Sequence, residues 1–200
     1  MDFGKIKSYI DRIVITDDLL EIGSDRGEGS TTILGSIAQT YQKTLHSVDM
    51  DVELINRNRQ KHQSMPINFY NAKGEDFLDQ VNNLKFSVIL LDNFDWDFVF
   101  ENKESPWYTM IKDQQVLYKS AYQLEMTNIN SQIAHLVQAI KLTNMMSDQC
   151  IVICDDTYTT NNQTFDGKCG AVVPYLMSLG FKPYTEINGV VMIRNEKING

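Results

Sequence analysis

Short apolar runs of strand length alternate along the chain with longer stretches whose apolar residues recur at helical spacing. Residues 86–92 and 150–155 form continuous runs rich in β-branched residues, which are typical of central parallel strands covered on both faces. The other predicted parallel strands are residues 18–23, 45–49 and 67–71, and the predicted helices are residues 3–13, 30–41, 52–62, 76–82, 131–146 and 169–179. This alternation predicts a doubly wound α/β fold.

The C-terminal residues depart from this alternation. Two strand-like runs, residues 181–187 and 190–195, flank Asn188-Gly189, and this dipeptide is a strong hairpin signal. Five parallel strands followed by an antiparallel hairpin give a predicted seven-stranded, mostly parallel sheet.

Residues 97–130 follow the predicted fourth strand and form a segment that this fold does not require. The segment is rich in aromatic residues, namely Phe98, Phe100, Trp107, Tyr108, Tyr118 and Tyr122. An insertion at this point lies over the carboxyl edge of the sheet, and we interpret it as a substrate lid or an oligomer contact. An aromatic face packed on its own domain is the alternative.

Size and charge indicate one compact domain, residues 1–200. A chain of 200 residues that is 42% apolar can bury a full core without disulfides or a structural metal. The net charge of −8 and the absence of a Lys/Arg cluster argue against a nucleic-acid partner. The sequence has no signal-peptide or membrane-span pattern, so we expect a cytoplasmic protein with reduced cysteines. Cys150 and Cys154 are expected to pack in the core, whereas Cys169 is open to either role.

The most informative motif is a glycine-rich turn between a predicted strand and a predicted helix. Its spacing is ExGxxxGxG, formed by Glu21, Gly23, Gly27 and Gly29, and the helix-start residue Ser30 follows. Glycines let the backbone turn tightly and approach a ligand where a Cβ would collide. A strand, a glycine turn and a helix N-terminus at the carboxyl edge of a parallel sheet predict a nucleotide-type cofactor site.

The spacing separates the candidate cofactors. A dinucleotide fingerprint that includes Gly27 would need a glycine where Thr32 stands. A phosphate-binding GxxxxGK[ST] loop around Gly167 fails, because Asn162 and Cys169 stand where glycine and Ser or Thr are required. The remaining pattern resembles motif I of the class I S-adenosylmethionine-dependent methyltransferases. A glycine-rich connection without a ligand is the alternative.

Asp49 ends the second predicted strand, 20 residues after Gly29. A carboxylate there can accept hydrogen bonds from both ribose hydroxyls of a nucleoside, and an ordinary surface acid is the alternative. The resemblance implies a Rossmann-like fold with S-adenosylmethionine as cofactor. It also implies that the segment NAKGEDFL lies near the adenine, with Lys73, Gly74 and Glu75 beside the base.

Three acids end the fourth and fifth predicted strands: Asp92, Asp155 and Asp156. Neighbouring parallel strands lie about 5 Å apart, so these carboxylates converge beside the expected cofactor. Close carboxylates repel one another unless a cation joins them, and Mg²⁺ binds through a few carboxylates while it keeps waters or substrate oxygens. The sequence therefore predicts a Mg²⁺ site, with Asp92 next to the cofactor as well.

The same acids resemble the metal site of catechol O-methyltransferase and of the macrocin-type sugar O-methyltransferases. This resemblance implies a catalytic role for Asp92. Where the catechol enzymes carry a lysine base, this chain has Asp95, which is a candidate general base, a further metal ligand or a helix N-cap. His135 is a second candidate base, although an ordinary, partly exposed helix residue is the favoured interpretation.

Gly167, Lys168, Cys169 and Gly170 precede the last predicted helix. Free backbone N–H groups together with the Lys168 ammonium could hold a carboxylate or phosphate of the substrate. The simpler interpretation is a glycine-rich helix start with a solvated Lys168.

These features together predict a methyltransferase that carries out Mg²⁺-dependent O-methylation of a small molecule, a sugar or a phenol. The alternatives are a metal-independent methyltransferase with an N or O acceptor, and a non-catalytic cofactor-binding protein. We expect a small-molecule acceptor, no nucleic-acid or membrane partner, and a homo-oligomer as one option.

Overall fold

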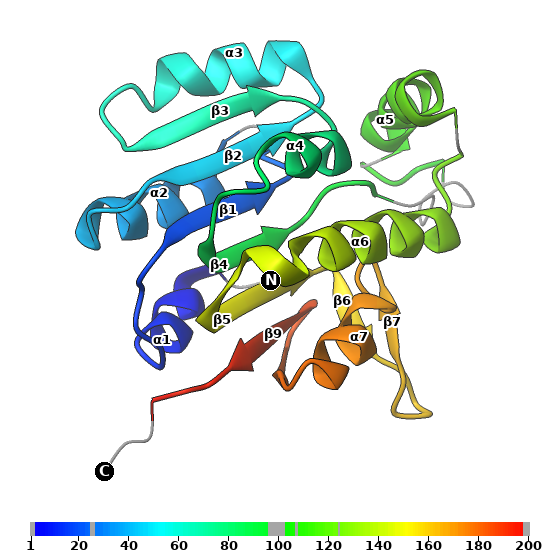
Figure 1. The fold of residues 1–200 in the computed structure, drawn as a ribbon. Helices are drawn as coiled ribbons and strands as arrows, with labels where there is room; N and C mark the ends of the chain where they lie inside the picture. The colour runs from blue at the N-terminus through cyan, green and yellow to red at the C-terminus, as the bar shows by residue number, and fades with distance from the viewer. Residues whose placement is uncertain (1–2, 25–26, 96–102, 107, 124, 198–200) are drawn as a thin grey trace.

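The computed structural model describes residues 3–24, 27–95, 103–106, 108–123 and 125–197. These residues contain a seven-stranded sheet with the order β3-β2-β1-β4-β5-β9-β8 (Figure 1). The strands are β1 (Asp18–Ile22), β2 (Leu45–Asp49), β3 (Ile67–Asn71), β4 (Phe86–Leu91), β5 (Met146–Asp155), β8 (Lys182–Glu186) and β9 (Gly189–Arg194). Strands β1 to β5 are parallel, and β9 runs antiparallel to both of its neighbours. The predicted α/β fold with its C-terminal hairpin is therefore confirmed.

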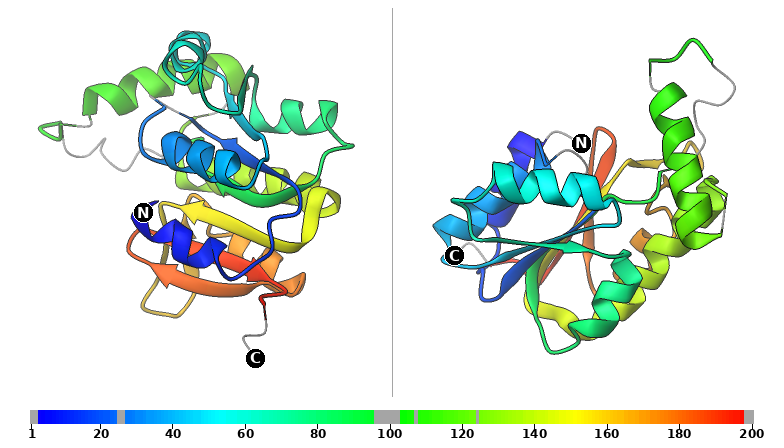
Figure 2. Two further views of the ribbon diagram at one scale, coloured as in Figure 1. Left: turned by 90° about the vertical axis from the view of Figure 1, so that its left-hand side faces the viewer. Right: turned by 90° about the horizontal axis from the view of Figure 1, so that it is seen from above.

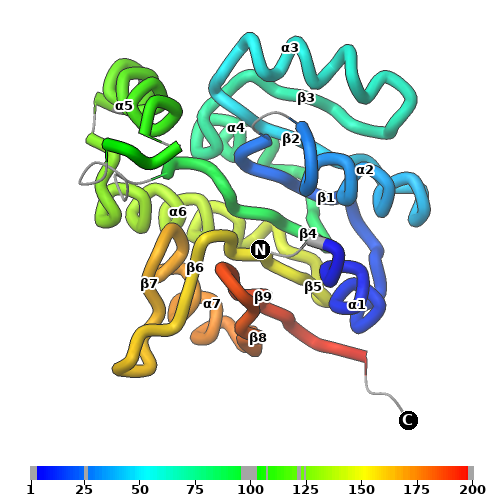
Figure 3. The backbone as a smooth tube through the Cα atoms, turned by 180° about the vertical axis from the view of Figure 1, so that it is seen from behind, coloured from blue at the N-terminus to red at the C-terminus, as the bar shows by residue number. Residues whose placement is uncertain are grey.

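Helices cover both faces of this sheet (Figure 2). One face carries α1 (Ile6–Ile10) and α2 (Ser30–Thr40), and the other carries α4 (Gly74–Gln80), α6 (Asn128–Leu142) and α7 (Val172–Ser178). Figure 3 shows the first of these faces from behind, and α3 (Val52–Lys61) lies beside the edge strand β3. Helix α1 is shorter than the helix predicted over residues 3–13. Among the described residues, no helix has both the length and the apolar character needed to cross a membrane.

The central strand β4 shows why its continuous apolar run predicts a position inside the sheet. All six of its residues are buried. Ile89 and Leu91 belong to the core under α4, α6 and α7, whereas Val88 and Leu90 belong to the core under α1 and α2. Because successive side chains of a strand point to opposite faces, a strand covered on both faces needs apolar residues at every position.

The three cysteines are free thiols, and all of them are buried. Cys150 and Cys154 pack in the apolar core, as the sequence predicts. Cys169, whose role was open, belongs to the same core.

Helices α6 and α7 begin at residues that differ from the prediction, and their contacts show why. Helix α6 begins at Asn128 instead of residue 131, because the Thr127 side chain caps it by accepting a hydrogen bond from the Asn130 N–H. Helix α7 begins at Val172 instead of residue 169, because the Cys169 N–H donates to a threonine hydroxyl outside the helix.

A short hairpin directly after β5 was not predicted from the sequence. It consists of β6 (Thr157–Thr159) and β7 (Phe165–Gly167), which pair antiparallel. The pairing sets Gly167 opposite Thr157 and so returns the chain to the carboxyl end of β5.

Helix α5 (Tyr108–Tyr122) belongs to the predicted insertion. The parallel strands point toward it in Figure 1, so it stands over the carboxyl edge of the sheet. A small apolar cluster joins it to the turn after β4 and to α6, and this cluster contains Phe94, Ile111, Tyr118 and Met126. The aromatic residues Phe98, Phe100 and Trp107 lie outside the described residues. The role of the insertion as a lid or an oligomer contact stays a prediction.

Candidate active site

A cavity of about 640 Å³ lies at the carboxyl ends of the parallel strands, where the strand order reverses between β1 and β4. Open α/β sheets bind their ligands at such switch points. On the side of β1, β2 and β3 the cavity is lined by Gly23, Asp49 and Gly74. On the side of β4 and β5 it is lined by Asp92, Asp95, Asp155, Asp156 and Lys168. Side chains of α5 complete the wall: Met110, Ile111, Gln114, Leu117 and Tyr118.

Gly23, the first glycine of the turn, lets the end of β1 lie directly against the end of β4. Its φ of 97° is in the left-handed region, and a Cβ at this position would clash with the main chain of Asp92. The Gly23 N–H donates to the Val48 carbonyl at 2.8 Å, which fixes the turn to β2. Gly27 has a φ of 65°, and a Cβ there would collide with the Asn58 side chain. Both positions therefore require glycine.

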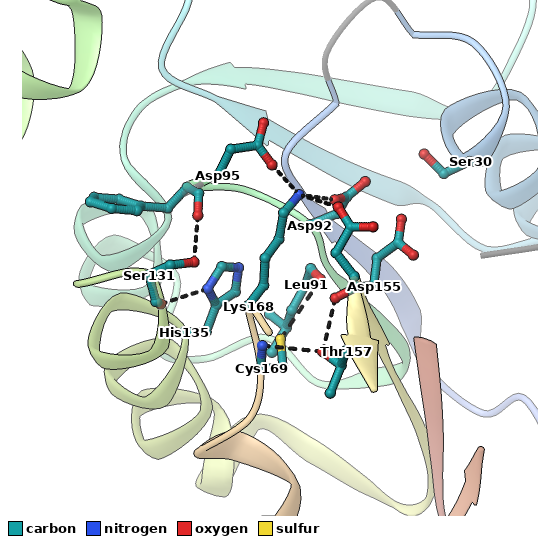
Figure 4. A network of polar contacts seen from close by, with 12 residues as sticks. Ser30, Leu91, Asp92, Asp95, Ser131, His135, Asp155, Thr157, Lys168 and Cys169 are labelled. Carbon is teal, nitrogen blue, oxygen red and sulfur yellow. Dashed lines mark hydrogen bonds and ion pairs between the residues drawn. The ribbon is translucent and has the colours of Figure 1, made fainter. Parts of the chain in front are cut away.

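Glu21 anchors this turn from inside the protein. Its buried carboxylate accepts hydrogen bonds at 2.7–3.0 Å from three hydroxyls, those of Ser30, Thr31 and Ser47. Burial raises the pKa of Glu21 to about 7, although these hydroxyls act in the opposite direction. Figure 4 shows Ser30 on α2, apart from the acids at the ends of β4 and β5. Glu21 and Ser30 thus hold the turn in place, and neither is among the described residues that line the cavity.

Asp49 lines the cavity at the end of β2. One of its carboxylate oxygens accepts a hydrogen bond from the Ser24 N–H at 3.0 Å, and the other accepts one from the Asp51 N–H at 2.9 Å. These bonds hold the carboxylate beside the glycine turn. The predicted juxtaposition of the glycine turn and Asp49 is therefore present.

Of the three residues expected near an adenine, two line the cavity and the third packs elsewhere. Lys73 and Gly74 line the cavity. Glu75 instead accepts a hydrogen bond from the Gln138 side chain of α6 at 3.1 Å, and burial raises the pKa of Glu75. Within the described part of the chain, Glu75, Gly27 and Gly29 do not line this cavity.

The turn after β4 presents two acids to the same space. Phe94 lies between them with a φ of 50°, in the left-handed region. Its N–H donates to the Tyr118 hydroxyl at 2.7 Å, and its carbonyl accepts a hydrogen bond from the Ser131 hydroxyl at 2.5 Å. Held in this way from α5 and α6, the turn places both Asp92 and Asp95 at the cavity.

The ammonium of Lys168 lies at the centre of these acids (Figure 4). Its Nζ is 2.8 Å from Asp92, 2.5 Å from Asp95 and 3.1 Å from Asp156, and its side chain is only 4% exposed. Burial by itself lowers the pKa of Lys168, but the three carboxylates outweigh this effect and hold that pKa well above its ordinary value. Burial and the neighbouring Asp155 raise the pKa of Asp92 well above its ordinary value, although Lys168 acts against them. These carboxylates therefore favour the charged form of Lys168.

The unpredicted hairpin of β6 and β7 positions Lys168 beside the acids. Gly167 has a φ of 89°, and a Cβ there would clash with the Asp156 carbonyl oxygen. The Lys168 N–H donates to the Asp156 carbonyl at 3.1 Å, and the Cys169 N–H donates to the Thr157 hydroxyl at 3.1 Å. The expected solvated lysine is therefore wrong. The alternative, an anion site, lacks donors, because the ammonium and these N–H groups already have partners.

The predicted Mg²⁺ ligands Asp92, Asp155 and Asp156 all line the cavity, but they share it with Lys168. Within the described residues, no group of three or more His, Cys, Asp or Glu side chains forms a geometry that could hold a metal ion. A divalent cation between Asp92 and Asp156 would stand next to the lysine ammonium and be repelled by it. The donor set does not fit Mg²⁺ while Lys168 is in place.

His135 is fully buried in α6, and the expectation of a partly exposed residue is wrong. Its Nδ1 lies 2.8 Å from the Ser131 carbonyl, which can only accept, so Nδ1 carries the proton. Burial lowers the pKa of His135 to about 4, which keeps the ring neutral near pH 7. His135 is not among the described residues that line the cavity, so its ring does not lie where a general base would act on an acceptor.

Two parts of the site were missed from the sequence. The first is the contact of Lys168 with the acids, which the Thr- and Asn-rich stretch between Thr157 and Phe165 could have indicated as a short hairpin. The second is the wall formed by α5, for which the sequence offers only the aromatic content of the insertion.

No protein-family model matches the chain, and no curated protein matches it. Solved structures share this fold, among them the following three. A candidate caffeoyl-CoA O-methyltransferase from Staphylococcus aureus has a TM-score of 0.60 and 14% identity, over 96% of this chain and 82% of that one. A candidate rRNA methylase from Clostridium thermocellum has a TM-score of 0.58 and 10% identity, over 100% and 97%. A candidate methyltransferase from Streptococcus mutans, in complex with SAH (S-adenosylhomocysteine), has a TM-score of 0.55 and 11% identity, over 96% and 97%. The chain thus has the Rossmann-like fold of S-adenosylmethionine-dependent methyltransferases.

Proposed function

We propose that this chain is an S-adenosylmethionine-dependent methyltransferase that transfers the methyl group to a hydroxyl group of a small molecule. One observation carries the proposal: a single cavity at the switch point of the sheet joins the glycine turn to a group of carboxylates. The glycine turn suits the nucleoside of the methyl donor. The carboxylates suit an acceptor molecule that carries O–H or N–H groups. The shared fold, including a neighbour with SAH bound, supports the choice of cofactor.

The donor binds on the side of β1, β2 and β3. Asp49 accepts hydrogen bonds from the ribose hydroxyls, because its carboxylate is held at the cavity by two backbone N–H groups. Gly74 and the apolar side chains of Met50 and Leu54 line the part of the cavity where we place the adenine. Gly23 lines the cavity where the end of β1 meets the end of β4, and we place the methionine part of the cofactor there.

The acceptor binds on the side of β4 and β5, under α5. Four carboxylates face one ammonium there, so an acceptor that brings a phosphate or carboxylate is repelled, whereas hydroxyl or amine groups are attracted. The apolar side chains of Met110 and Leu117 contact the carbon skeleton of the acceptor. A small sugar or a phenol has this combination of groups.

Methyl transfer forms a bond between the acceptor oxygen and the methyl carbon while the carbon–sulfur bond of the cofactor breaks. The hydroxyl proton moves to a carboxylate, and we assign this role to Asp95, which lines the cavity and has a side chain that is 19% exposed. Lys168 cannot take the proton, because its raised pKa keeps it charged. Most of the acceleration comes from alignment, since the sulfonium already carries a good leaving group.

An amine acceptor is the second candidate, and the excess of carboxylates in the cavity favours it. A protonated amine is attracted to the acids and must lose its proton to one of them before it attacks the methyl group. Both candidates share the cofactor site, so an acceptor screen separates them.

The cofactor site is tested by calorimetric titration of S-adenosylmethionine into the wild type and Asp49→Asn. We expect 10- to 100-fold weaker binding by the variant, since hydrogen bonds to a charged group are worth about 1.5–3 kcal/mol. Asp79→Asn is the matched control, because Asp79 is an exposed acid paired with Lys141 outside the cavity. A wild type that binds no S-adenosylmethionine contradicts the proposal.

The acceptor class is tested by transfer of a labelled methyl group to sets of neutral sugars, phenols, amines and phosphorylated compounds. Transfer to a hydroxyl compound supports the first candidate, and transfer to amines alone supports the second. Cofactor binding with no transfer to any of these sets favours a non-catalytic cofactor-binding protein.

A further inference from the structure

We propose that Lys168 is a built-in replacement for a divalent cation: its ammonium occupies the metal position among the carboxylates, and its removal opens a metal site. The wild-type cavity therefore binds neither Mg²⁺ nor Mn²⁺. The catalytic meaning of this inference rests on the proposed function, but metal binding can be measured without cofactor or acceptor.

The coordination of the ammonium supports this role. Its three carboxylate partners come from separate segments: Asp92 follows β4, Asp95 lies in the next turn and Asp156 follows β5. An ammonium has three N–H donors, and here each has an oxygen within 3.1 Å. Lys168 thus gathers the oxygens of a hard-cation site in the manner of a metal ion.

The charge balance shows why these acids need a cation. The cavity contains the carboxylates of Asp92, Asp95, Asp155 and Asp156, and Lys168 is the cation that contacts them in the described structure. Carboxylates this close repel one another when nothing compensates them. A divalent ion bound to these oxygens would stand next to the ammonium and be repelled by it, so the two cations are alternatives.

The backbone around Gly167 positions the Lys168 ammonium among the carboxylates. Gly167 adopts a left-handed conformation against the Asp156 carbonyl, and Asp156 itself has a φ of 43°. The neighbouring His135, beside the Lys168 side chain in Figure 4, is neutral, so Lys168 supplies the positive charge at this position. A solvated surface lysine would need none of these features.

Lys168 is a positioning residue in this scheme. Its donors are engaged by carboxylates, so it orients Asp92 and Asp95 toward the acceptor and neutralises part of their charge. A divalent ion would do the same in a metal-dependent enzyme.

The test uses Mn²⁺ as the probe and measures the signal of the free ion by electron paramagnetic resonance in 150 mM NaCl. We expect no bound Mn²⁺ in the wild type at millimolar concentrations, and one bound ion in Lys168→Met, with an affinity at least tenfold higher than that of the wild type. Lys168→Arg keeps the charge and should bind none. Lys168→Met combined with Asp92→Asn should lose the new site.

Two results would overturn the inference. The first is Mn²⁺ binding by the wild type that Asp92→Asn removes, and the second is a folded Lys168→Met that binds no more Mn²⁺ than the wild type. Circular dichroism reports whether each variant folds, and Lys168→Gln replaces the methionine variant if that one does not. The wild-type titration is decisive in every case.

A second arm links the site to turnover once an acceptor is known. Wild-type turnover should be unchanged by EDTA, whereas turnover by Lys168→Met should fall at least tenfold and recover in part with Mg²⁺ or Mn²⁺. Inhibition of the wild type by EDTA would overturn the inference. Failure of the proposed function would show itself separately, as absent S-adenosylmethionine binding.

Discussion

The two sides of the cavity are built by different means. The side of β1, β2 and β3 is made mainly by backbone, because Gly23 permits a close approach of two strand ends and the Asp49 carboxylate is held by the backbone N–H groups of Ser24 and Asp51. The side of β4 and β5 is made by charged side chains, and its central contact joins Lys168 to an acid 76 residues away. The first side depends mainly on the backbone path and on one carboxylate, whereas the second depends on several charges that a distant hairpin brings together.

The largest expected effect comes from Gly23→Ala. The new Cβ would clash with the main chain of Asp92 at a residue whose φ is 97°, so β1 and β4 must move apart. We expect a loss of about 3–5 kcal/mol of unfolding free energy and no measurable S-adenosylmethionine binding. Urea unfolding and calorimetry measure the two effects.

Gly29→Ala is the matched control for this change. Gly29 also has a positive φ, 59°, but a Cβ there would meet nothing within 4 Å. The control should cost only the backbone strain of an alanine at φ 59° and ψ −105°, about 1–3 kcal/mol, without a clash. If Gly29→Ala were as damaging as Gly23→Ala, the close approach of β1 and β4 would not be what the first glycine provides.

The next effect separates the two sides of the cavity. Gly167→Ala would drive a Cβ into the Asp156 carbonyl and displace Lys168, without touching the glycine turn. We expect a loss of about 3 kcal/mol of stability and at least a 100-fold loss of turnover. The affinity for S-adenosylmethionine should stay within threefold of the wild type, as measured by calorimetry. A parallel loss of cofactor affinity would show that the two sides are not separable.

The contrast between the two sides also explains what the sequence could predict. The strands β4 and β5 and the glycine turn are local signals: continuous apolar runs and closely spaced glycines in a segment of ten residues or fewer. The acids at the strand ends follow from the strands themselves, because parallel strands finish at one edge. These parts of the fold and site could therefore be predicted from the sequence.

The remaining parts depend on contacts between distant segments. Nothing in the neighbourhood of Lys168 indicates that its partner is Asp92, since a short polar hairpin has to form first. The burial of His135 depends on how α6 packs against its neighbours, and a helix pattern with mixed polar positions does not show that. Convergent acids indicate a cation, but whether it is a metal or a lysine is decided by tertiary structure.

Glu21 predicts a pH dependence on the first side. Folding raises the pKa of this carboxyl from 4.5 to about 7, so the folded protein holds a proton that the unfolded chain releases in that interval. The stabilising contribution is complete below pH 4.5 and is lost as the pH rises to 7. Relative to Glu21→Gln, the wild type should lose on the order of 3 kcal/mol of unfolding free energy between pH 4.5 and pH 8.

Urea unfolding at several pH values measures this difference. Glu53→Gln, a change of an exposed acid in the first turn of α3, is the control and should stay parallel to the wild type. A wild type that gains stability over Glu21→Gln as the pH rises would contradict the assignment of a raised pKa.

The smallest expected effect comes from Ser131→Ala. The change removes the hydrogen bond that the Ser131 hydroxyl donates to the buried Phe94 carbonyl. We expect a loss of about 1–2 kcal/mol of stability and a several-fold fall in turnover, because the turn that carries Asp92 and Asp95 loosens. Thermal unfolding and turnover assays at fixed cofactor concentration report these effects. Unchanged turnover would indicate that Tyr118 alone is enough to hold the turn.

A crystal structure with SAH tests the central claim most directly, because the claim is that one cavity serves both donor and acceptor. We predict the ribose hydroxyls at the Asp49 carboxylate, the adenine beside Gly74 and the sulfur facing the group of Asp92, Asp95 and Lys168. A saturated crystal in which this cavity holds no nucleoside, or in which the sulfur points away from those acids, would contradict the account.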